Sequence, residues 1–240
     1  MPDKRKHRGQ HPADAHLFGP AMVDRLQHAI EDLSWLWSRG YAEKASLKLV
    51  GDHYQLKARQ RDAVARCTCT TKARKLRQKK KVRMAALENQ PLLIDGFNLL
   101  ITIESALSNG IIFDCLDSCY RDLASIHGTY KRVVETEKAI LLIGEGLNAL
   151  KTGKVHWLFD KPVSNSGRLK TLLYEISDQK EWDWEIDLCY DPDAELVQST
   201  DVVISSDSMV LDQTNRWANL ARYLIDTYAP HAAILRFSFD

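Results

Sequence analysis

Four aspartates stand at, or just after, the ends of segments that are expected to be buried β-strands. Asp95 ends LLID, Asp160 ends VHWLFD, Asp207 follows VVISS, and Asp193 lies in the loop after WEIDLCY. In an open parallel sheet the carboxyl ends of the strands share one edge, and ligands bind just beyond that edge. If the strands are parallel neighbours, the four carboxylates converge there.

Clustered carboxylates indicate metal chemistry because their charges repel one another. Two such charges about 4 Å apart repel by about 4 kcal/mol at an effective dielectric of about 20, so the cluster takes up protons or binds a hard cation. Mg²⁺ and Mn²⁺ prefer oxygen ligands, activate a bound water and neutralise charge on a phosphate. The pattern favours metal-dependent phosphodiester hydrolysis. The alternative for each single aspartate is a turn or a helix cap, a role that suits Asp207 before SMVLDQ.

Strands and helices alternate from residue 91 onward, which predicts an α/β domain over 91–240 with a mainly parallel sheet flanked by helices. LLIDGFNLLITI is expected to be a strand that runs into a loop. Further strands are expected at VHWLFD, WEIDLCY, DVVISSD and AAILRFSF. Helices are expected at FDCLDSCYRDLASIHG, KRVVETEKAILLIGEGLNAL, SNSGRLKTLLYEISDQK and DSMVLDQTNRWANLARYLIDTY.

The front of the chain has a different character. Residues 1–19 are expected to be a disordered basic tail, 20–70 a small helical basic domain, and 71–90 a basic linker or helix. Residues 1–90 contain 20 Lys and Arg against 9 Asp and Glu, whereas the remainder has 13 against 23. This asymmetry, hidden in a net charge of +1, predicts a polyanionic partner for the front part.

Two groups of residues are candidates for contact with nucleic-acid phosphates. The first is cationic: Arg59, Arg61 and Arg66 on the third expected helix, and Lys79, Lys80 and Lys81 in KARKLRQKKKVR. The second lies in PVSNSGR, where Ser164, Asn165 and Ser166 stand at a helix start and Arg168 adds a charged donor. The alternatives are a solvated helical linker for the lysine run and a plain helix cap for PVSNSGR.

Other signals exclude several classes of protein. No apolar run reaches the roughly 18 residues of a membrane span, and MPDKRKHRGQHPADAH lacks the apolar core of a signal peptide. We therefore expect a cytoplasmic protein without a membrane partner. Five cysteines, an odd number, fit no disulfide framework and are expected to stay reduced. Neither a Gly-x-Ser-x-Gly elbow nor a phosphate-binding Gly-x-x-x-x-Gly-Lys loop occurs.

Three of the strand segments resemble motifs of PIN-like nucleases, especially those of the NYN branch. IDGFNLL is similar to the first-strand motif, HWLFD to the middle strand, and VVISSDSMVLD to the later strand. The resemblance implies a PIN/NYN-like fold and a ribonuclease site that uses Mg²⁺ or Mn²⁺. It implies Asp95, Asp160 and Asp207 as catalytic metal ligands, with Asn98 ordering the first loop and contacting the substrate.

One further acid of the PIN pattern, carried on a helix, has no certain counterpart. Asp193 is the preferred fourth metal ligand, and Glu104 and Glu145 are weaker alternatives. The whole chain from about residue 20 also resembles a prokaryotic family of paired domains of unknown function. That resemblance is carried by DRLQHAIEDLSWLWSRGYAEKASLKLVGDHYQL in the front part and by DGFNLL, PVSNSGRL and SDS in the rest.

The sequence therefore predicts a divalent-metal-dependent ribonuclease whose basic N-terminal part holds RNA, the preferred partner. One alternative is a non-catalytic RNA-binding or regulatory protein with a vestigial nuclease site. Another is a different phosphate-handling transferase that uses the same acids. Phosphate contacts do not distinguish RNA from DNA as the partner. The sequence also allows a homodimer.

Overall fold

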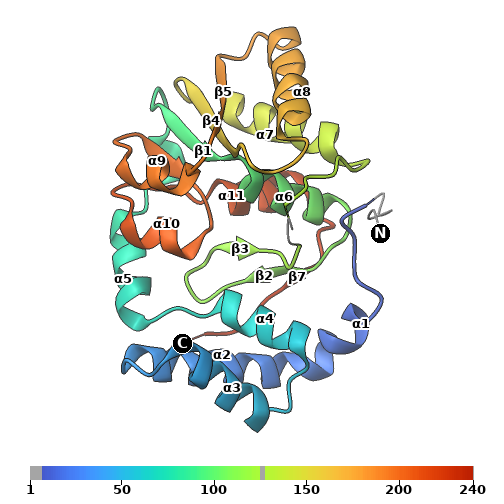
Figure 1. Cartoon of the computed structure of the whole chain (residues 1–240), viewed down its shortest axis with the longest axis vertical. Coiled ribbons are helices and arrows are strands. Elements are labelled where there is room, and N and C mark those ends of the chain that lie inside the picture. The colour runs from blue at the N-terminus through green and yellow to red at the C-terminus, as the bar shows by residue number, and fades with distance from the viewer. Residues whose placement is uncertain (1–6, 125–127, 240) are drawn as a thin grey trace.

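The computed structural model describes residues 7–124 and 128–239, and it arranges them as two β-sheets stacked between layers of helices (Figure 1). The helices are α1 (Asp14–Leu17), α2 (Val23–Ser38), α3 (Glu43–His53), α4 (Ala58–Cys67), α5 (Thr71–Lys80), α6 (Gly96–Leu107), α7 (Thr136–Ala149), α8 (Ser166–Gln179), α9 (Pro192–Gln198), α10 (Ser208–Gln213) and α11 (Leu220–Tyr228), with single 3-10 turns at Pro20–Met22 and Met84–Ala86. The strands are β1 (Leu92–Asp95), β2 (Ile112–Asp114), β3 (Tyr120–Arg121), β4 (Val155–Asp160), β5 (Trp184–Cys189), β6 (Val202–Ile204) and β7 (Ile234–Leu235).

The main sheet has four strands in the order β5-β4-β1-β6, and every pair in it is parallel. Helices α6, α7, α8 and α11 cover one face, where Trp157 and Phe159 of β4 lie fully buried. Helices α9 and α10 cover the other face and bury Leu93 and Leu158. The expected α/β architecture with a mostly parallel, helix-flanked sheet is confirmed.

Strand β1 passes directly into helix α6, so the expected loop after this strand is wrong. The Asp95 side chain accepts a hydrogen bond from the Asn98 backbone N–H and caps the helix. Gly96, the first helical residue, packs against the Phe159 ring so closely that a Cβ atom there would overlap the ring. Strand and helix therefore join without an intervening loop.

The second sheet is small and has the order β3-β2-β7. It replaces much of the helix expected over FDCLDSCYRDLASIHG, whose residues 125–127 lie outside the described ranges. Phe113 and Tyr120 are fully buried in neighbouring strands, and the Cys115 N–H bonds the Cys119 carbonyl to close the turn between them. The apolar residues whose spacing predicted one face of a helix therefore lie in β2, in the turn after it and in β3. The final strand, β7, pairs with β2 and not with the main sheet.

The helical front part is not a separate body. One hydrophobic core contains Leu26, Leu33 and Val64 from α2 and α4 together with Phe113 and Leu116. The expected boundary at residue 91 therefore marks a change in sequence character, but side chains from both sides of it pack together. Helix α5, part of the expected basic linker, contacts α10 beside the main sheet. The long helix expected over 207–228 is broken into α10 and α11.

The expected disordered tail is also wrong for the residues that the structure describes. Arg8 pairs with the buried Glu104, and Asp14, itself buried, accepts two hydrogen bonds from Arg59 at 2.6 and 3.0 Å. These buried pairs hold residues 7–19 against the rest of the chain. Residues 1–6, which the same expectation included, lie outside the described ranges.

The cysteines form no disulfide bonds within the described residues. All five cysteines carry free thiols, and the sulfur atoms of Cys67 and Cys115 lie 3.6 Å apart. Within the described ranges, no helix combines the length and the apolar character needed to cross a membrane.

Candidate active site

The four candidate aspartates stand at the same edge of the main sheet. Asp95 ends the central strand β1, and Asp160 ends its neighbour β4. Asp193 lies in the first turn of α9, just after β5, and Asp207 stands between β6 and α10. Because all four strands run in parallel, these positions share the carboxyl edge of the sheet.

Asp95 is the most enclosed of the four. Its carboxylate accepts a hydrogen bond from the Ser205 hydroxyl at 2.8 Å and a longer one from the Asn98 N–H at 3.4 Å. Burial, together with smaller contributions from the negative charges of Asp193 and Asp207, raises the pKa of Asp95 to about 7 despite these two donors. This carboxyl therefore binds a proton near neutral pH unless a cation compensates its charge.

The neighbouring carboxylates are also destabilised in their charged forms. Partial burial raises the pKa of Asp193, and the charges of Asp207, Asp160 and Asp191 add to the effect. Partial burial likewise raises the pKa of Asp160, with a contribution from Asp191. The charge of Asp207 thus acts on both Asp95 and Asp193, and that of Asp160 acts on Asp193, so negative potential extends along this edge of the sheet.

No lysine or arginine within the described residues forms an ion pair with Asp95, Asp160, Asp193 or Asp207. Other polar groups engage two of them: Ser205 donates to Asp95, and Asp207 caps α10 by accepting the N–H groups of Met209 and Val210 at 2.7 and 3.3 Å. The expected capping role of Asp207 is thus present. It leaves the second carboxylate oxygen of Asp207 available to a ligand.

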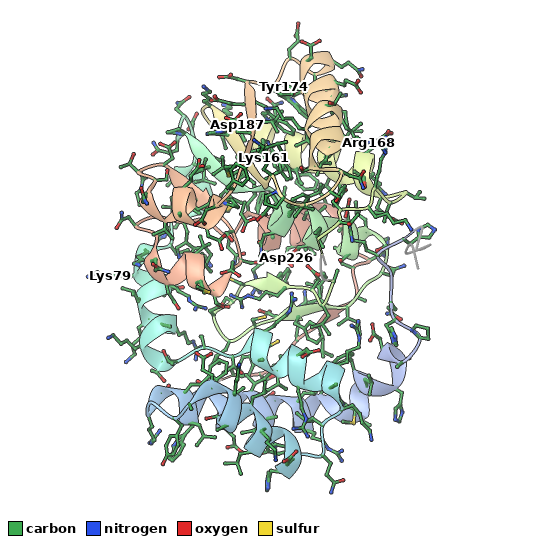
Figure 2. All side chains as sticks on the ribbon, viewed as in Figure 1. Lys79, Lys161, Arg168, Tyr174, Asp187 and Asp226 are labelled. Carbon is green, nitrogen blue, oxygen red and sulfur yellow. The ribbon has the colours of Figure 1, made fainter. Side chains whose placement is uncertain are left out.

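The four carboxylates are spread more widely than the ligands of a closed metal cage. Across the described residues, the set with three ligand atoms within 4.8 Å of one another is His156 of β4 with Glu185 and Asp187 of the outer strand β5. That set already has cationic partners: Lys154 pairs with Glu185 at 2.8 Å, and Lys170 with Asp187 at 3.3 Å. We interpret it as a surface ion-pair group, which Figure 2 shows beside α8 at the position of Asp187.

A cleft of about 530 Å³ opens beside the acidic edge. Asp160, Asp207 and Asn98 line this cleft, as do Arg66 and Arg121. Arg66 comes from the end of α4, is exposed, and donates a hydrogen bond to the Asp122 carbonyl at 3.0 Å. The cleft is thus lined both by an arginine of the helical front part and by carboxylates of the main sheet.

Comparison with known proteins follows this division of the chain. The family described as "Domain of unknown function (DUF5616)" matches residues 84–223, more than half of the chain and all four aspartates. The chain belongs to this family. A second family, "Protein of unknown function (DUF434)", matches residues 25–80, which span α2 to α5. The expected pairing of two domains of unknown function is confirmed.

One curated relative is similar to the chain over nearly its whole length. The chain is 31% identical over 204 residues to "Uncharacterized protein MJ0935" of Methanocaldococcus jannaschii, an alignment that covers 85% of this chain and 95% of the relative. No solved structure matches the chain.

Several residues expected to bind phosphate have internal partners. Arg59 is paired with Asp14, and Arg61 donates to Asp52 at 2.8 Å and to the Leu56 carbonyl at 2.9 Å. Both guanidinium groups are thus engaged in internal bonds, and their contact with substrate stays a prediction.

The lysine run does not line the cleft, and of PVSNSGR only Val163, which was not a candidate, is among the described residues that line it. Lys79 points away from α5 into solvent (Figure 2), whereas Lys80 donates to the Asp212 carbonyl at 2.9 Å and Lys81 lies over the Trp217 ring. Ser166 is 4% exposed and cannot reach a substrate, which corrects that assignment.

The start of α8 also differs from expectation. Asn165 adopts a left-handed backbone with φ of 69° and donates its side-chain amide to the Tyr130 carbonyl, so no side chain caps this helix. Ser164 is exposed beside it, and its backbone pairs with the strand-like segment at Thr129. Asn165 and Arg168 line a separate cavity of about 310 Å³, together with Lys131 and Arg132.

The two weaker acid candidates do not reach the site. Glu104 is fully buried further along α6, bound by Arg8, Tyr130 and Thr136. Glu145 is exposed on α7 and does not line the cleft. Asp193 is therefore the fourth acid at the edge.

Other residues of the site were missed by the sequence analysis. Ser205 holds Asp95, and the Asn98 side-chain oxygen accepts both the Ser206 N–H at 2.8 Å and the Ser206 hydroxyl at 2.9 Å. The serine pair directly before Asp207 in ISSD was the available signal. Asp191, which caps α9, could have been noticed in YDPD. Nothing in the local sequence indicates that Arg121 lines the cleft.

Proposed function

We propose that this protein is a divalent-metal-dependent ribonuclease whose site lies at the carboxyl edge of the main sheet. The observation that carries the proposal is the convergence of Asp95, Asp160, Asp193 and Asp207, from four parallel strands, without a cationic partner among the described residues. Folding has gathered negative charge at a cleft at a cost in free energy. Such a site is retained where a cation or a proton is needed.

The donor set fits Mg²⁺ or Mn²⁺. Both ions take oxygen ligands, and Mg²⁺ in particular keeps several waters and is held by one or two carboxylates plus substrate phosphates. The spacing of the four aspartates, wider than a closed cage, suits that mode of binding. When bound, such an ion lowers the pKa of a water and neutralises charge on the phosphate.

The chain's own residues supply the remaining parts. Asp95 provides oxygens at the end of the central strand β1, and Asp207 provides them after the neighbouring strand β6. Asp160 and Asp193 extend the acidic edge on the other side of β1. Asn98 fixes the Ser206 backbone, which directly precedes Asp207. Arg66 is placed across the cleft to bind a phosphodiester oxygen, a charge-assisted contact suited to an exposed guanidinium.

Asp95→Asn tests this proposal directly. The variant keeps the size of the side chain and its acceptor oxygen for Ser205, but it cannot offer a charged ligand. We expect RNA binding to persist within about twofold, while cleavage of a labelled RNA in Mn²⁺ falls at least about 100-fold, a loss comparable to that of a preorganised electrostatic group.

The matched control is Asp183→Asn. Asp183 is an exposed aspartate at the amino end of β5, on the opposite edge of the same sheet. The Asp183→Asn variant should cleave RNA at the wild-type rate. Equal cleavage by wild type and Asp95→Asn would reject this site, and salt-sensitive RNA binding without cleavage in any divalent metal would establish the vestigial, non-catalytic alternative.

A further inference from the structure

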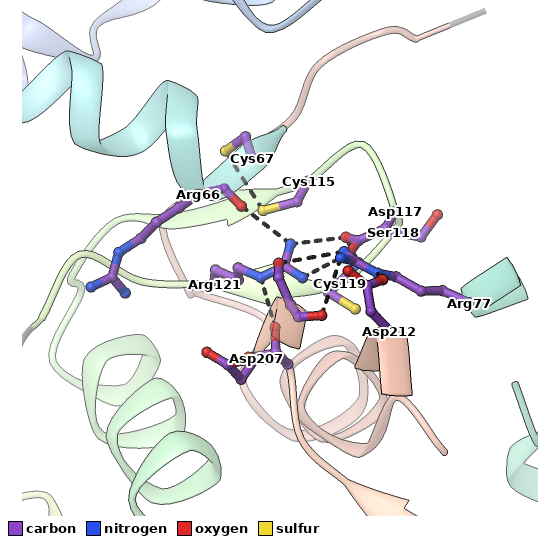
Figure 3. Close-up of polar contacts among 12 residues, drawn as sticks. Arg66, Cys67, Arg77, Cys115, Asp117, Ser118, Cys119, Arg121, Asp207 and Asp212 are labelled. Carbon is purple, nitrogen blue, oxygen red and sulfur yellow. Dashed lines mark hydrogen bonds and ion pairs between the residues drawn. The ribbon is translucent and has the colours of Figure 1, made fainter. Parts of the chain in front are cut away.

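A buried ion network joins the helical front part to the segment that carries Asp207 (Figure 3). Its centre is Asp117, in the turn between β2 and β3, which is 6% exposed. Arg121 of β3 donates to both carboxylate oxygens of Asp117, at 2.9 and 2.7 Å, and Arg77 of α5 donates to one of them at 2.6 Å. Both arginines are buried as well.

The two arginines also reach the backbone on either side of Asp207. Arg121 donates from Nε to the Ser206 carbonyl at 2.8 Å. Arg77 donates to the Ser208 carbonyl at 3.2 Å and to the Ser208 hydroxyl at 3.4 Å. The residues on both sides of Asp207, Ser206 and Ser208, are therefore each held by a cationic donor.

The network is anchored in two helices of the front part. Arg77 belongs to α5, and it also pairs with Asp212 of α10 at 2.7 Å. Arg121 also donates a hydrogen bond, at 3.3 Å, to the Arg66 carbonyl near the end of α4. Movement of α4 or α5 would consequently be transmitted to the segment around Asp207.

Such a network is better suited to fixing a geometry than to adding stability. Taking two guanidinium groups and a carboxylate out of water costs several kcal/mol for each ion, roughly as much as their attraction returns. Burial acts to raise the pKa of Asp117, but Arg121 and Arg77 hold it well below its usual range, so the network stays charged across the neutral range. Its carboxylate is saturated by arginines and is unavailable to a metal.

We propose that Arg121 and Arg77 are positioning residues that act through Asp117 to hold both sides of Asp207, and so make the helical front part a structural component of the acidic site. This inference rests on the proposed nuclease function for its catalytic consequence. It assigns α4 and α5 a role beyond RNA contact, because they fix a candidate metal ligand in place.

Hydrogen exchange tests the positioning without requiring activity. In Arg121→Lys and Arg77→Lys the charge is kept, but a single ammonium group cannot bond both Asp117 and the serine carbonyl in the same geometry. In the metal-free full chain, we expect amide exchange over residues 206–210 to become at least about tenfold faster, because this segment then opens locally more often.

Arg8→Lys is the matched control. Arg8 also pairs with a buried carboxylate, that of Glu104, and none of its bonded partners lines the cleft. Its exchange over residues 206–210 should match the wild type. Unchanged exchange in both network variants would overturn the inference, and because either lysine variant suffices, misfolding of one of them does not prevent the decision.

Cleavage kinetics supply the second readout. A misplaced Asp207 should lower kcat for RNA cleavage in Mn²⁺ about tenfold or more and leave KM within about twofold, because a shift of about 1 Å at a catalytic group has effects of this size. A wild-type kcat in variants with faster exchange would also overturn the inference. If the wild type cleaves no RNA, the nuclease proposal fails separately, and the exchange data together with Mn²⁺ affinity decide whether the network holds Asp207 for cation binding.

Discussion

Replacing Asp95 with asparagine should stabilise the metal-free protein, and the gain should depend on pH. In the wild type, the folded state binds the Asp95 proton more tightly than the unfolded chain does, because burial raises its pKa to about 7 from an ordinary 3.8. Between these values the unfolded chain has already lost the proton that the folded protein keeps. The stability contributed by this group is therefore largest in acid and is lost as the pH rises from about 4 to about 7.

The size of the effect follows from the same two values. A tenfold change in proton affinity corresponds to about 1.4 kcal/mol, so a pKa that moves from 3.8 to about 7 gives about 4 kcal/mol as an upper limit. Asparagine stays neutral and keeps an acceptor for Ser205. The free energy of unfolding of Asp95→Asn should therefore exceed that of the wild type by almost nothing at pH 3 and by roughly 2–4 kcal/mol at pH 8.

Urea denaturation at fixed ionic strength, repeated from pH 3 to pH 8 with a chelator present, measures this difference. Asp183→Asn serves as the exposed control and should show no such trend. Adding Mn²⁺ should then largely cancel this difference at pH 8, since a ligand at about 100 times its dissociation constant stabilises the wild type by about 2.7 kcal/mol but finds a weakened site in Asp95→Asn. A difference between the two proteins that stays flat with pH would refute the argument that Asp95 is destabilised by its surroundings.

Three further substitutions probe other parts of the site. Ser205→Ala removes the hydroxyl donor to Asp95, so the pKa of that carboxyl should rise further and Mn²⁺ affinity, measured by calorimetry, should fall about 10-fold or more, as is usual for groups that support a metal ligand. Arg66→Ala should weaken RNA binding and reduce the slope of log affinity against log salt by about 0.7, the value for one phosphate contact on a single strand. Gly96→Ala forces a Cβ atom into the Phe159 ring and should lower the free energy of unfolding by about 1–3 kcal/mol in urea denaturation.

Two variants serve as controls for these substitutions. Gly167→Ala places a methyl group in open space on α8, so it should raise stability slightly, by up to about 1 kcal/mol, because alanine favours a helix more than glycine. A loss similar to that of Gly96→Ala would mean that glycine replacement in general, and not the contact behind Asp95, is responsible. Arg61→Ala should change stability but not the salt slope, since Arg61 is bonded to Asp52 and Leu56.

The strand-end positions of the aspartates could be read from the sequence because the underlying rule is local. LLID and HWLFD are apolar runs of strand length that stop at an acid, and parallel strands place such stops at one edge. The edge order β5-β4-β1-β6 then brings Asp95 beside both Asp160 and Asp207. This part of the arrangement needed no knowledge of distant contacts.

The errors arose where distant partners decide the structure. Phe113 lies in a strand because the helices of the front part and β7 pack against it, and Tyr120 lies in one because it joins the core of the main sheet. Their spacing in the chain does not signal either contact. Arg59 and Arg77 are cations in the sequence but halves of ion pairs in the fold, with Asp14 and Asp117 as partners 45 and 40 residues away. No local pattern signals a pairing over such separations.

These pairings change the meaning of the basic front part. A count of charges predicts a broad cationic surface, yet the guanidinium groups of Arg59, Arg61 and Arg77 are directed into the protein. The exposed cations are concentrated on α5, including Lys79. Among the described residues that line the cleft, the exposed cation is Arg66, since Arg121 is buried. Because α5 packs against α10, whose first turn Asp207 caps, an RNA strand held along α5 would lead toward the acidic edge. The position of a few uncompensated charges, and not their excess along the sequence, would then determine where the phosphate backbone lies.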